Sequence, residues 1–437
     1  MSTKFRNILI GLTLMVLVFC LLSVYTCSGS SCFGMTSPTA APFKNDFDAY
    51  LQGKLLKHSF SQSSLDRSRH VNLEADDVLV YLHIQKTGGA TFGRHLVHNL
   101  DVQPPCECEP GVKKCECFTR NNRVWLFSRH STGWMCGVHA DWTELHDCVD
   151  EWFQENDVKS RKNRRYHYIT FLRDPLPRFL SEWQHVRRGA TWKAARLHCN
   201  GHEATLEEVP FCYTGEDWTD VTFEEFISCK HNLAFNRMTR MLANLTKVNC
   251  YDWSSLEPAF VNSTLLASAK ENLLEFAFFG IVEEQRKTQF LFERTFGLRF
   301  IENFEQRENT HVSRIDITGE MQQRVIHANG LDVQLYQYAK DMFLQRVRAM
   351  EKKLNYTVEE YFESIRDGAV EEEEEETVDE GRMFEDPLDD EAEEAGGEFS
   401  PPRRSGPVRS SRRGESPNLR PMRTLQRRQH VEGREGS

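Results

Sequence analysis

Two short stretches of this sequence carry residues that suit the binding of an anion. The first is Lys86-Thr-Gly-Gly-Ala-Thr91, which follows an apolar run at 78–84 and precedes a run with helical spacing at 91–99. A strand, a glycine-containing turn with a lysine, and a helix N-terminus together favour phosphate, because backbone N–H groups and the helix dipole face the anion. Taken alone, the stretch also fits a plain strand–turn–helix connection whose glycines only relieve crowding.

The position of the lysine restricts the kind of phosphate loop. A Walker A loop requires Gly-x4-Gly-Lys-Ser/Thr, with the lysine after the last glycine. In this sequence Lys86 precedes both Gly88 and Gly89. A nucleoside triphosphatase or nucleotide kinase is therefore disfavoured, whereas an anion-binding loop is not.

The second stretch follows another apolar run, at 166–172, which ends in Arg173-Asp174-Pro175. A helix is expected from 177, with Ser181 on it. In doubly wound sheets ligands bind at the carboxyl ends of the strands, so Arg173 and Ser181 are predicted to face one anion. An ion pair between Arg173 and Asp174 that closes the turn is the alternative.

The remaining periodicity predicts an α/β fold with a central parallel sheet flanked by helices. Further strands are expected at 124–127, 276–282 and 298–304. Asp141 and Glu144 have the spacing of a capping box and predict a helix start. Helices are also predicted at 223–245, 286–296 and 318–354, the last with a break at Asn329-Gly330.

The N-terminal sequence predicts a membrane anchor. Residues 8–25 contain no charge and are just long enough to span a bilayer, and Lys4 and Arg6 precede them. Positive charge on this side predicts a cytoplasmic tail at 1–7 and a lumenal remainder. A cleaved signal peptide is the alternative. The polar residues 26–75 are expected to form a stem.

The cysteines and glycosylation sequons favour the same compartment. Ten of the thirteen cysteines lie between Cys106 and Cys250, an even number that indicates disulfides of open pairing. Two Cys-x-Cys pairs in this block leave a zinc site as the alternative. Sequons begin at Asn244, Asn262 and Asn355.

The net charge of −11 comes mainly from the C-terminal tail. Residues 371–398 carry sixteen acidic residues and one arginine, and 401–437 carry ten arginines and three glutamates. Without these −15 and +7 segments, −3 remains for 1–370, so affinity for a polyanion requires a local patch and no nucleic acid partner is expected. Residues 368–437 are predicted to be disordered.

The two anion-binding stretches together resemble the paired signatures of sulfotransferases. The strings His83-Ile-Gln-Lys-Thr-Gly-Gly, Leu126-Phe-Ser-Arg129, His139-Ala-Asp-Trp-Thr-Glu-Leu145 and Arg188-Gly-Ala-Thr-Trp-Lys193 are similar to heparan sulfate 6-O-sulfotransferases. The resemblance covers about residues 75–350. It implies a P-loop-like nucleotide sulfotransferase domain at 76–355 in a single-pass type II protein of the Golgi membrane.

The resemblance also implies roles for individual residues. The donor would be 3′-phosphoadenosine 5′-phosphosulfate (PAPS), and no metal would be required. Lys86 would neutralise the leaving phosphate, Arg173 and Ser181 would hold the 3′-phosphate, and His139 would be the general base. The N–H cradle would comprise Thr87, Gly88, Gly89, Ala90 and Thr91. The family loop usually has threonine where this sequence has Ala90, and activity is expected to survive this change because backbone donors remain.

The acceptor implied by the resemblance is the polysaccharide heparan sulfate, modified at the glucosamine 6-hydroxyl. Cations and flat rings suit a sulfated glycan, and the candidates are Arg129, Trp134, Arg188, Trp192 and Lys193. The tryptophans also fit a core role and the cations an ordinary surface. A sulfotransferase for another glycosaminoglycan hydroxyl, or a non-catalytic heparan-sulfate-binding protein, are the alternatives.

Overall fold

The computed structural model describes residues 47–66, 71–73, 76–156, 164–193, 195, 197–304 and 318–373. The predicted membrane span at 8–25 lies outside these residues, and so does the part beyond 373 of the tail predicted to be disordered at 368–437. Residues 368–373 of that tail are instead helical. None of the described helices is both long and apolar enough to cross a bilayer.

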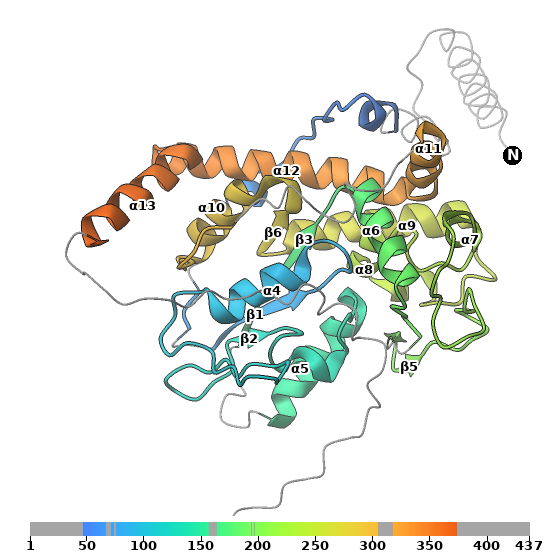
Figure 1. Cartoon of the computed structure of the whole chain (residues 1–437), viewed down its shortest axis with the longest axis horizontal. Helices are drawn as coiled ribbons and strands as arrows, with labels where there is room; N and C mark the ends of the chain where they lie inside the picture. Colours follow the sequence, from blue (N-terminus) through green and yellow to red (C-terminus); the bar gives the residue numbers. More distant parts are fainter. Residues whose placement is uncertain are drawn as a thin grey trace, which may run out of the picture. The chain divides into compact units, whose positions relative to one another are not determined.

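Four parallel strands form the central sheet, in the order β2-β1-β3-β6 (Figure 1). They are β1 (Asp77–Leu82), β2 (Leu126–Phe127), β3 (Arg165–Leu172) and β6 (Phe278–Ile281). The strands are almost wholly buried, which explains why they read as continuous apolar runs rather than alternating ones. The predicted α/β fold with a central parallel sheet is confirmed.

Helices surround this sheet, and a two-stranded ribbon of β4 (His198–Cys199) and β5 (His202–Glu203) lies apart from it. In chain order the helical segments are α3 (Gln62–Leu65), α4 (Gly89–His98), η1 (Thr132–Cys136), α5 (Trp142–Asn156), α6 (Pro175–Arg187), α7 (Phe223–Ser228), α8 (Arg237–Leu242), η2 (Leu245–Val248), α9 (Pro258–Glu275), η3 (Val282–Glu284), α10 (Gln285–Phe296), α11 (Gly319–Ala328), α12 (Gly330–Leu354) and α13 (Val358–Glu373).

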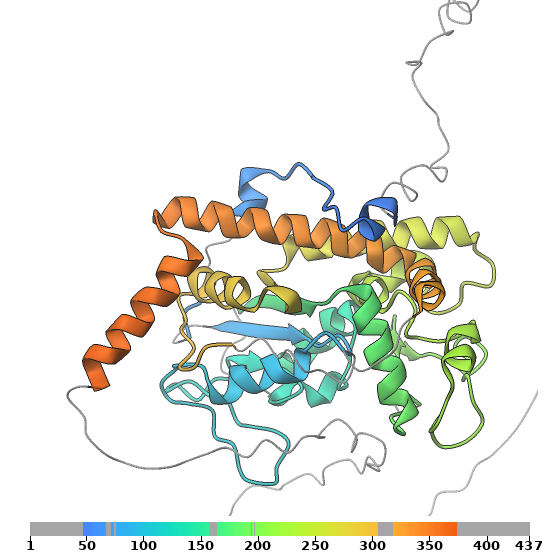
Figure 2. The same ribbon diagram turned by 45° about the horizontal axis from the view of Figure 1, so that its top comes forward.

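Aromatic rings fasten α4 and α10 to one face of the sheet. Phe92 of α4 lies with its ring centroid 4.2 Å from that of Phe171 on β3 and 5.7 Å from that of Phe292 on α10. On the opposite face, Phe279 of β6 meets Phe343 of α12 at 6.3 Å. In Figure 2, β1 lies between α4 on one side and α12 on the other. The position of α4 matters most for function, because its N-terminus ends the first candidate anion loop.

Two predicted elements are wrong. The strand expected at 298–304 is irregular and makes only an isolated bridge between Leu100 and Phe300. The helix expected at 223–245 is divided into α7 and α8, and α8 begins after Asn236, whose φ of 46° lies in the left-handed region. The apolar periodicity of both stretches reflects burial of loop side chains, which sequence spacing does not distinguish from burial of a regular element.

The folded part extends beyond both ends of the segment 76–355. Residues 47–66, within the predicted stem, lie along α12, where the backbone N–H of His58 donates to Asp341 at 2.6 Å. At the other end, Tyr361 of α13 donates a hydrogen bond to Glu293 of α10 at 2.5 Å. Both segments are polar in composition, so the sequence did not indicate that they pack against the domain at 76–355.

Disulfide bonding of the ten clustered cysteines is confirmed. The pairs are Cys106–Cys117, Cys108–Cys115, Cys136–Cys148, Cys199–Cys250 and Cys212–Cys229. The first two pairs use all four cysteines of the two Cys-x-Cys motifs and link two neighbouring chain segments. Their sulfurs are therefore not available as thiolate ligands for zinc.

Gly280 permits the close packing of β6 against β3. A Cβ atom at this position would lie 2.6 Å from Cζ of Phe171 and 2.7 Å from Cγ2 of Thr288. We expect Gly280→Ala to lower the free energy of unfolding by about 1–3 kcal/mol, because neither neighbour can withdraw from the packed core. Urea denaturation followed by tryptophan fluorescence measures this loss.

Gly319→Ala is the matched control for this prediction. Gly319 begins α11, and a Cβ atom added there meets nothing within 4 Å. Unchanged or slightly increased stability is expected for the control. Equal stability of the Gly280 and Gly319 variants would contradict the packing argument.

Candidate active site

The ends of β1, β3 and β6 bring the candidate residues to one edge of the sheet. All strands are parallel, so the segments beginning at His83, Arg173 and Val282 leave the sheet on the same side. Arg129, two residues after β2, belongs to the same edge. This is the edge at which open α/β sheets bind ligands.

The loop after β1 has the backbone of an anion cradle. Lys86 has φ 62° and Gly88 has φ 73°, so the chain turns sharply before α4 begins at Gly89. A Cβ atom on Gly89 would lie 2.1 Å from Cδ2 of His83 and 2.6 Å from Oη of Tyr81. Gly89 therefore allows the first turn of α4 to approach the side chains at the end of β1.

The first turn of α4 offers N–H donors to this candidate cradle. The N–H groups of Gly89, Ala90 and Thr91 have no intrahelical carbonyl partner by helix geometry. The side chain of Thr87 is buried and donates to the carbonyl of Ile84 at 2.9 Å, so it shapes the loop internally. Ala90 is also buried, at 8% exposure. Its methyl group is compatible with the start of the helix and offers no hydroxyl to an anion.

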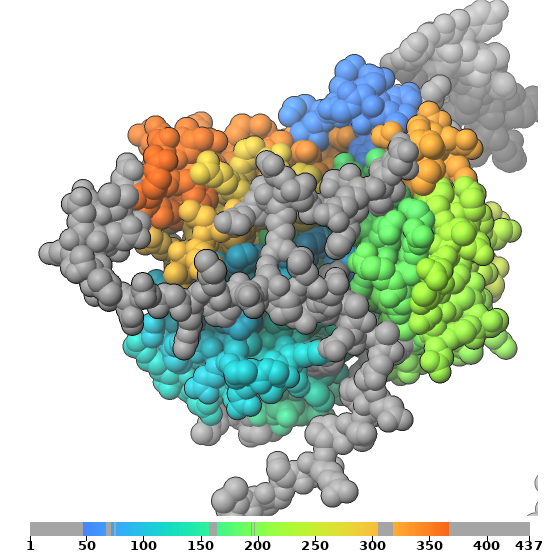
Figure 3. All heavy atoms as spheres, in the orientation of Figure 1, coloured from blue at the N-terminus to red at the C-terminus, as the bar shows by residue number. Residues whose placement is uncertain are grey.

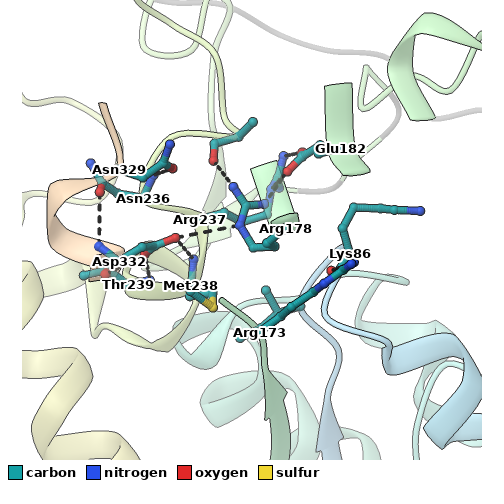
Figure 4. Close-up of polar contacts among 12 residues, drawn as sticks. Lys86, Arg173, Arg178, Glu182, Asn236, Arg237, Met238, Thr239, Asn329 and Asp332 are labelled. Carbon is teal, nitrogen blue, oxygen red and sulfur yellow. Dashed lines mark hydrogen bonds and ion pairs between the residues drawn. The ribbon is translucent and has the colours of Figure 1, made fainter. Parts of the chain in front are cut away.

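Arg173 connects the two predicted anion-binding stretches. Its Nη1 donates to the carbonyl of Lys86 at 3.2 Å, and Figure 4 shows the Arg173 side chain reaching the main chain of Lys86, whose own side chain extends away from it. The carboxylate of Asp174 caps α6, because it accepts from the backbone N–H of Leu176 at 3.0 Å. Asp174 therefore has a structural role besides the predicted alternative of an ion pair with Arg173. Ser181 lies two turns along this helix and is partly buried.

His139 lies against the other side of the loop. Its Nδ1 is 3.4 Å from the carbonyl oxygen of His83, and the two imidazole rings are 4.9 Å apart. A carbonyl only accepts, so Nδ1 carries the proton in this contact and Nε2 is the nitrogen with a lone pair. The disulfide Cys136–Cys148 fixes η1, which immediately precedes this segment, to α5.

His83 is held neutral at the centre of the site. Burial, aided by the charge of Arg129 and the neighbouring His139, lowers its pKa well below the usual value. Arg129 donates from Nη1 to Nδ1 of His83 at 3.3 Å, which places the imidazole proton on Nε2. Because His83 is neutral, it does not add electrostatic repulsion to the positive charges of Lys86, Arg129 and Arg173.

Trp192 forms the wall beside His139. Its ring is 5.5 Å from that of His139 in an edge-to-face arrangement and 5.6 Å from that of His185. A cavity of about 240 Å³ opens beside it, lined in part by Lys193, Leu206, Phe211 and Tyr213. Nζ of Lys193 lies 4.3 Å from the ring centre of Tyr213, so a cation and flat rings share this cavity.

The other two acceptor candidates differ in position. Arg188 is the C-cap residue that follows α6, and it is exposed. Trp134 belongs to η1, and its side chain lies outside the described part of the structure. The structure thus brings six of the candidates into one region, namely Lys86, Arg129, His139, Arg173, Trp192 and Lys193, whereas Arg188 lies at the exposed end of a helix.

A buried ionic network supports Trp192 and α6. Glu182 accepts hydrogen bonds from Nη1 of Arg178 at 2.5 Å and from Nε of Arg237 at 3.1 Å (Figure 4). The guanidinium of Arg237 lies 5.5 Å from the ring centre of Trp192. Asp332 of α12 is 3.9 Å from Nε of Arg178 and accepts from the backbone N–H of Thr239 at 2.8 Å.

Sequence reasoning did not identify His83, Glu182 or Arg237 as parts of the site. His83 lies next to the predicted anion loop, but the prediction was based only on the lysine and the glycines of that loop. Glu182 follows Arg178 by four residues, a spacing that indicates a helical ion pair, but Arg237 is distant in sequence. Only the folded chain brings these residues together.

The described residues contain one group with the spacing of metal ligands, and it is not a metal site. His98 lies near Cys108 and Cys115. The two sulfurs are joined in a disulfide, so they lack the thiolate charge that zinc requires.

Comparison with known proteins gives a consistent family. The sulfotransferase family model matches residues 69–339. Heparan-sulfate 6-O-sulfotransferase 2 of Gallus gallus is 47% identical over 81% of this chain and 89% of that protein. Heparan-sulfate 6-O-sulfotransferase 1 of Homo sapiens is 52% identical over 66% of this chain and 71% of that protein. The mouse form of heparan-sulfate 6-O-sulfotransferase 2 is 46% identical over 81% of this chain, which spans only 59% of that relative.

The buried network predicts how acid affects stability. Burial alone would raise the pKa of Glu182, but Arg237 and Arg178 outweigh burial and lower it from 4.5 to about 2. A folded-state pKa below the unfolded one stabilises the fold above pH 4.5, and this contribution is lost as the pH falls towards 2. Glu182→Gln should therefore cost roughly 3–5 kcal/mol at pH 7 and flatten the stability profile between pH 4.5 and 2.

Glu224→Gln is the control for this titration. Glu224 is exposed and pairs with Arg324 at 2.6 Å and 2.8 Å, so its loss should change stability far less. Denaturant unfolding of both variants across this pH range makes the comparison. A Glu182 variant with the stability and pH dependence of the unaltered protein would exclude a stabilising role for the network.

Proposed function

Because the chain belongs to the sulfotransferase family, we propose that it transfers the sulfuryl group of PAPS to the 6-hydroxyl of glucosamine in heparan sulfate. The observation that carries this proposal is the hydrogen bond from Arg173 to the carbonyl of Lys86. It joins one candidate anchor for each end of a nucleotide that has an anionic group at both its 5′ and its 3′ position. The names of the relatives support the acceptor and the 6-position.

The donor fits the residues of the loop. The tight approach allowed by Gly89 and the open N–H groups of the first turn of α4 suit the 5′-phosphosulfate, and Lys86 adds a full positive charge. Arg173 and Ser181 would hold the 3′-phosphate, with Arg173 as a fork-shaped donor that suits phosphate oxygens. Anchoring at both ends fixes the nucleotide so that the sulfur faces the acceptor.

In the proposed reaction His139 removes the proton from the acceptor hydroxyl. The proton moves to Nε2, the hydroxyl oxygen forms a bond to sulfur, and the bond from sulfur to the bridging oxygen breaks. Charge is spread over peripheral oxygens in such in-line transfers, so Lys86 and Arg129 would stabilise it and the leaving phosphate. The products are adenosine 3′,5′-bisphosphate and the sulfated sugar. In the proposed reaction the proton transfer and the charge stabilisation are carried out by side chains, without a metal ion.

The acceptor groove is proposed along Arg129, Trp192 and Lys193, with Trp134 and Arg188 as its further candidates. Trp192 stands beside His139, and a sugar ring stacked on its face would present a hydroxyl to Nε2. The cavity beyond Trp192 combines Lys193 with aromatic rings, as a carboxylated glycan requires.

The proposed location is the lumenal side of the Golgi membrane, with the predicted span at 8–25 as anchor. Five disulfides support an oxidising compartment. Asn262 and Asn355 are exposed and Asn244 is partly buried, so the first two sequons are the more accessible to a glycan.

The acceptor is tested by product analysis. The protein is incubated with labelled donor and with heparan sulfate that lacks 6-O-sulfate, and the labelled disaccharides are identified. Label at the glucosamine 6-position is expected. Label at another position would overturn the acceptor assignment, and glycan binding without label would favour the non-catalytic alternative.

The proposed base is tested by His139→Ala. A positioned base contributes about 10²–10⁴-fold, so turnover should fall by this factor while adenosine 3′,5′-bisphosphate still binds with nearly unchanged affinity. His146→Ala is the control, since His146 is an exposed residue that stacks on Trp142 of α5. Turnover by the His139 variant at the rate of the control would remove His139 from this role.

A further inference from the structure

Residues 47–66 form a segment, here called the N-terminal strap, that follows α12 across the domain. Figures 1, 2 and 3 show it (blue) against this helix (orange). Leu56 donates its N–H to Gln337 at 3.3 Å, and Arg346 donates to the carbonyl of Ser64 at 3.1 Å. The strap precedes the residues matched by the family, 69–339, so its contacts are not explained by that match.

The beginning of the strap reaches the end of β3. Residues 47–51 are helical, and the hydroxyl of Tyr50 donates a hydrogen bond to Oδ1 of Asp174. The same oxygen of Asp174 accepts from the N–H of Leu176 and caps α6. Tyr50 is thus in direct contact with the residue between Arg173 and the helix that carries Ser181.

Asp174 also contacts Glu283, in the segment that follows β6. Its backbone N–H donates to Oε1 of Glu283 at 3.0 Å, and the hydroxyl of Tyr336 on α12 donates to Oε2 of Glu283 at 2.9 Å. Burial raises the pKa of both carboxyl groups. Two partly buried carboxyl groups in one network require donors to keep them in place, and Tyr50 supplies one of those donors.

We propose that Tyr50 is a positioning residue for the subsite of the 3′-phosphate. Through Asp174 it sets the start of α6, and with it the places of Arg173 and Ser181. The strap therefore forms part of the donor site although it lies outside the matched family region. This inference rests on the proposed function, which assigns the 3′-phosphate to Arg173 and Ser181.

The inference is tested by Tyr50→Phe in the full chain, with two nucleotides as probes. Loss of one hydrogen bond should weaken binding of adenosine 3′,5′-bisphosphate about fivefold to tenfold in calorimetric titration. Binding of adenosine 5′-phosphate, which lacks the 3′-phosphate, should not change. The KM for PAPS should rise while kcat at saturating donor is retained.

Tyr338→Phe is the matched control, because it removes the same atom from the same interface. The Tyr338 ring packs against His58 at 5.3 Å and Phe60 at 5.2 Å, both in the strap. This variant should keep the ratio of the two nucleotide affinities. In an Asp174→Ala background, which lacks the acceptor of this hydrogen bond, Tyr50→Phe should cause no further loss of the ratio.

Three outcomes would overturn the inference. They are an unchanged affinity ratio in Tyr50→Phe, an equal weakening of both nucleotides, and the same change of ratio in Tyr338→Phe. Failure of the proposed function has a different signature: the unaltered protein would then not prefer the bisphosphate over the monophosphate.

Discussion

The register between β1 and β3 is the constraint on which the candidate site depends. The strands pair from Asp77 opposite Arg165 to Leu82 opposite Thr170. The first pair is closed by the guanidinium of Arg165, which donates to both carboxylate oxygens of Asp77 at 2.6 Å and 2.7 Å. A slip of one residue would turn every side chain to the opposite face and separate Arg173 from the carbonyl of Lys86.

The sheet and its loops were largely predictable because local sequence determines them. Residues 78–84 and 166–172 are short apolar runs, and buried parallel strands have this pattern. The glycines at 88 and 89 and the Pro175 that starts α6 mark where each strand connection turns. For such segments, spacing alone indicates where the candidate anion-binding groups lie.

The parts that sequence did not predict depend on distant contacts. The strap is polar in composition, yet Asp341 and Gln337 of α12 accept its backbone N–H groups. Arg237 reaches Glu182 across 55 residues, and the neutral state of His83 arises from burial beside Arg129. No periodicity encodes such pairs, so the surroundings of the candidate base were found only in the folded chain.

His83 has two separate uses, and together they bear on how this domain can be engineered. Its main-chain carbonyl orients His139, and its imidazole accepts from Arg129 while it packs over Gly89. The candidate anion loop and the segment with the candidate base consequently both depend on one residue. A chimera that exchanges residues 83–91 but keeps 129–139 would place a residue from another protein against Arg129 and His139. The two segments should therefore be exchanged together.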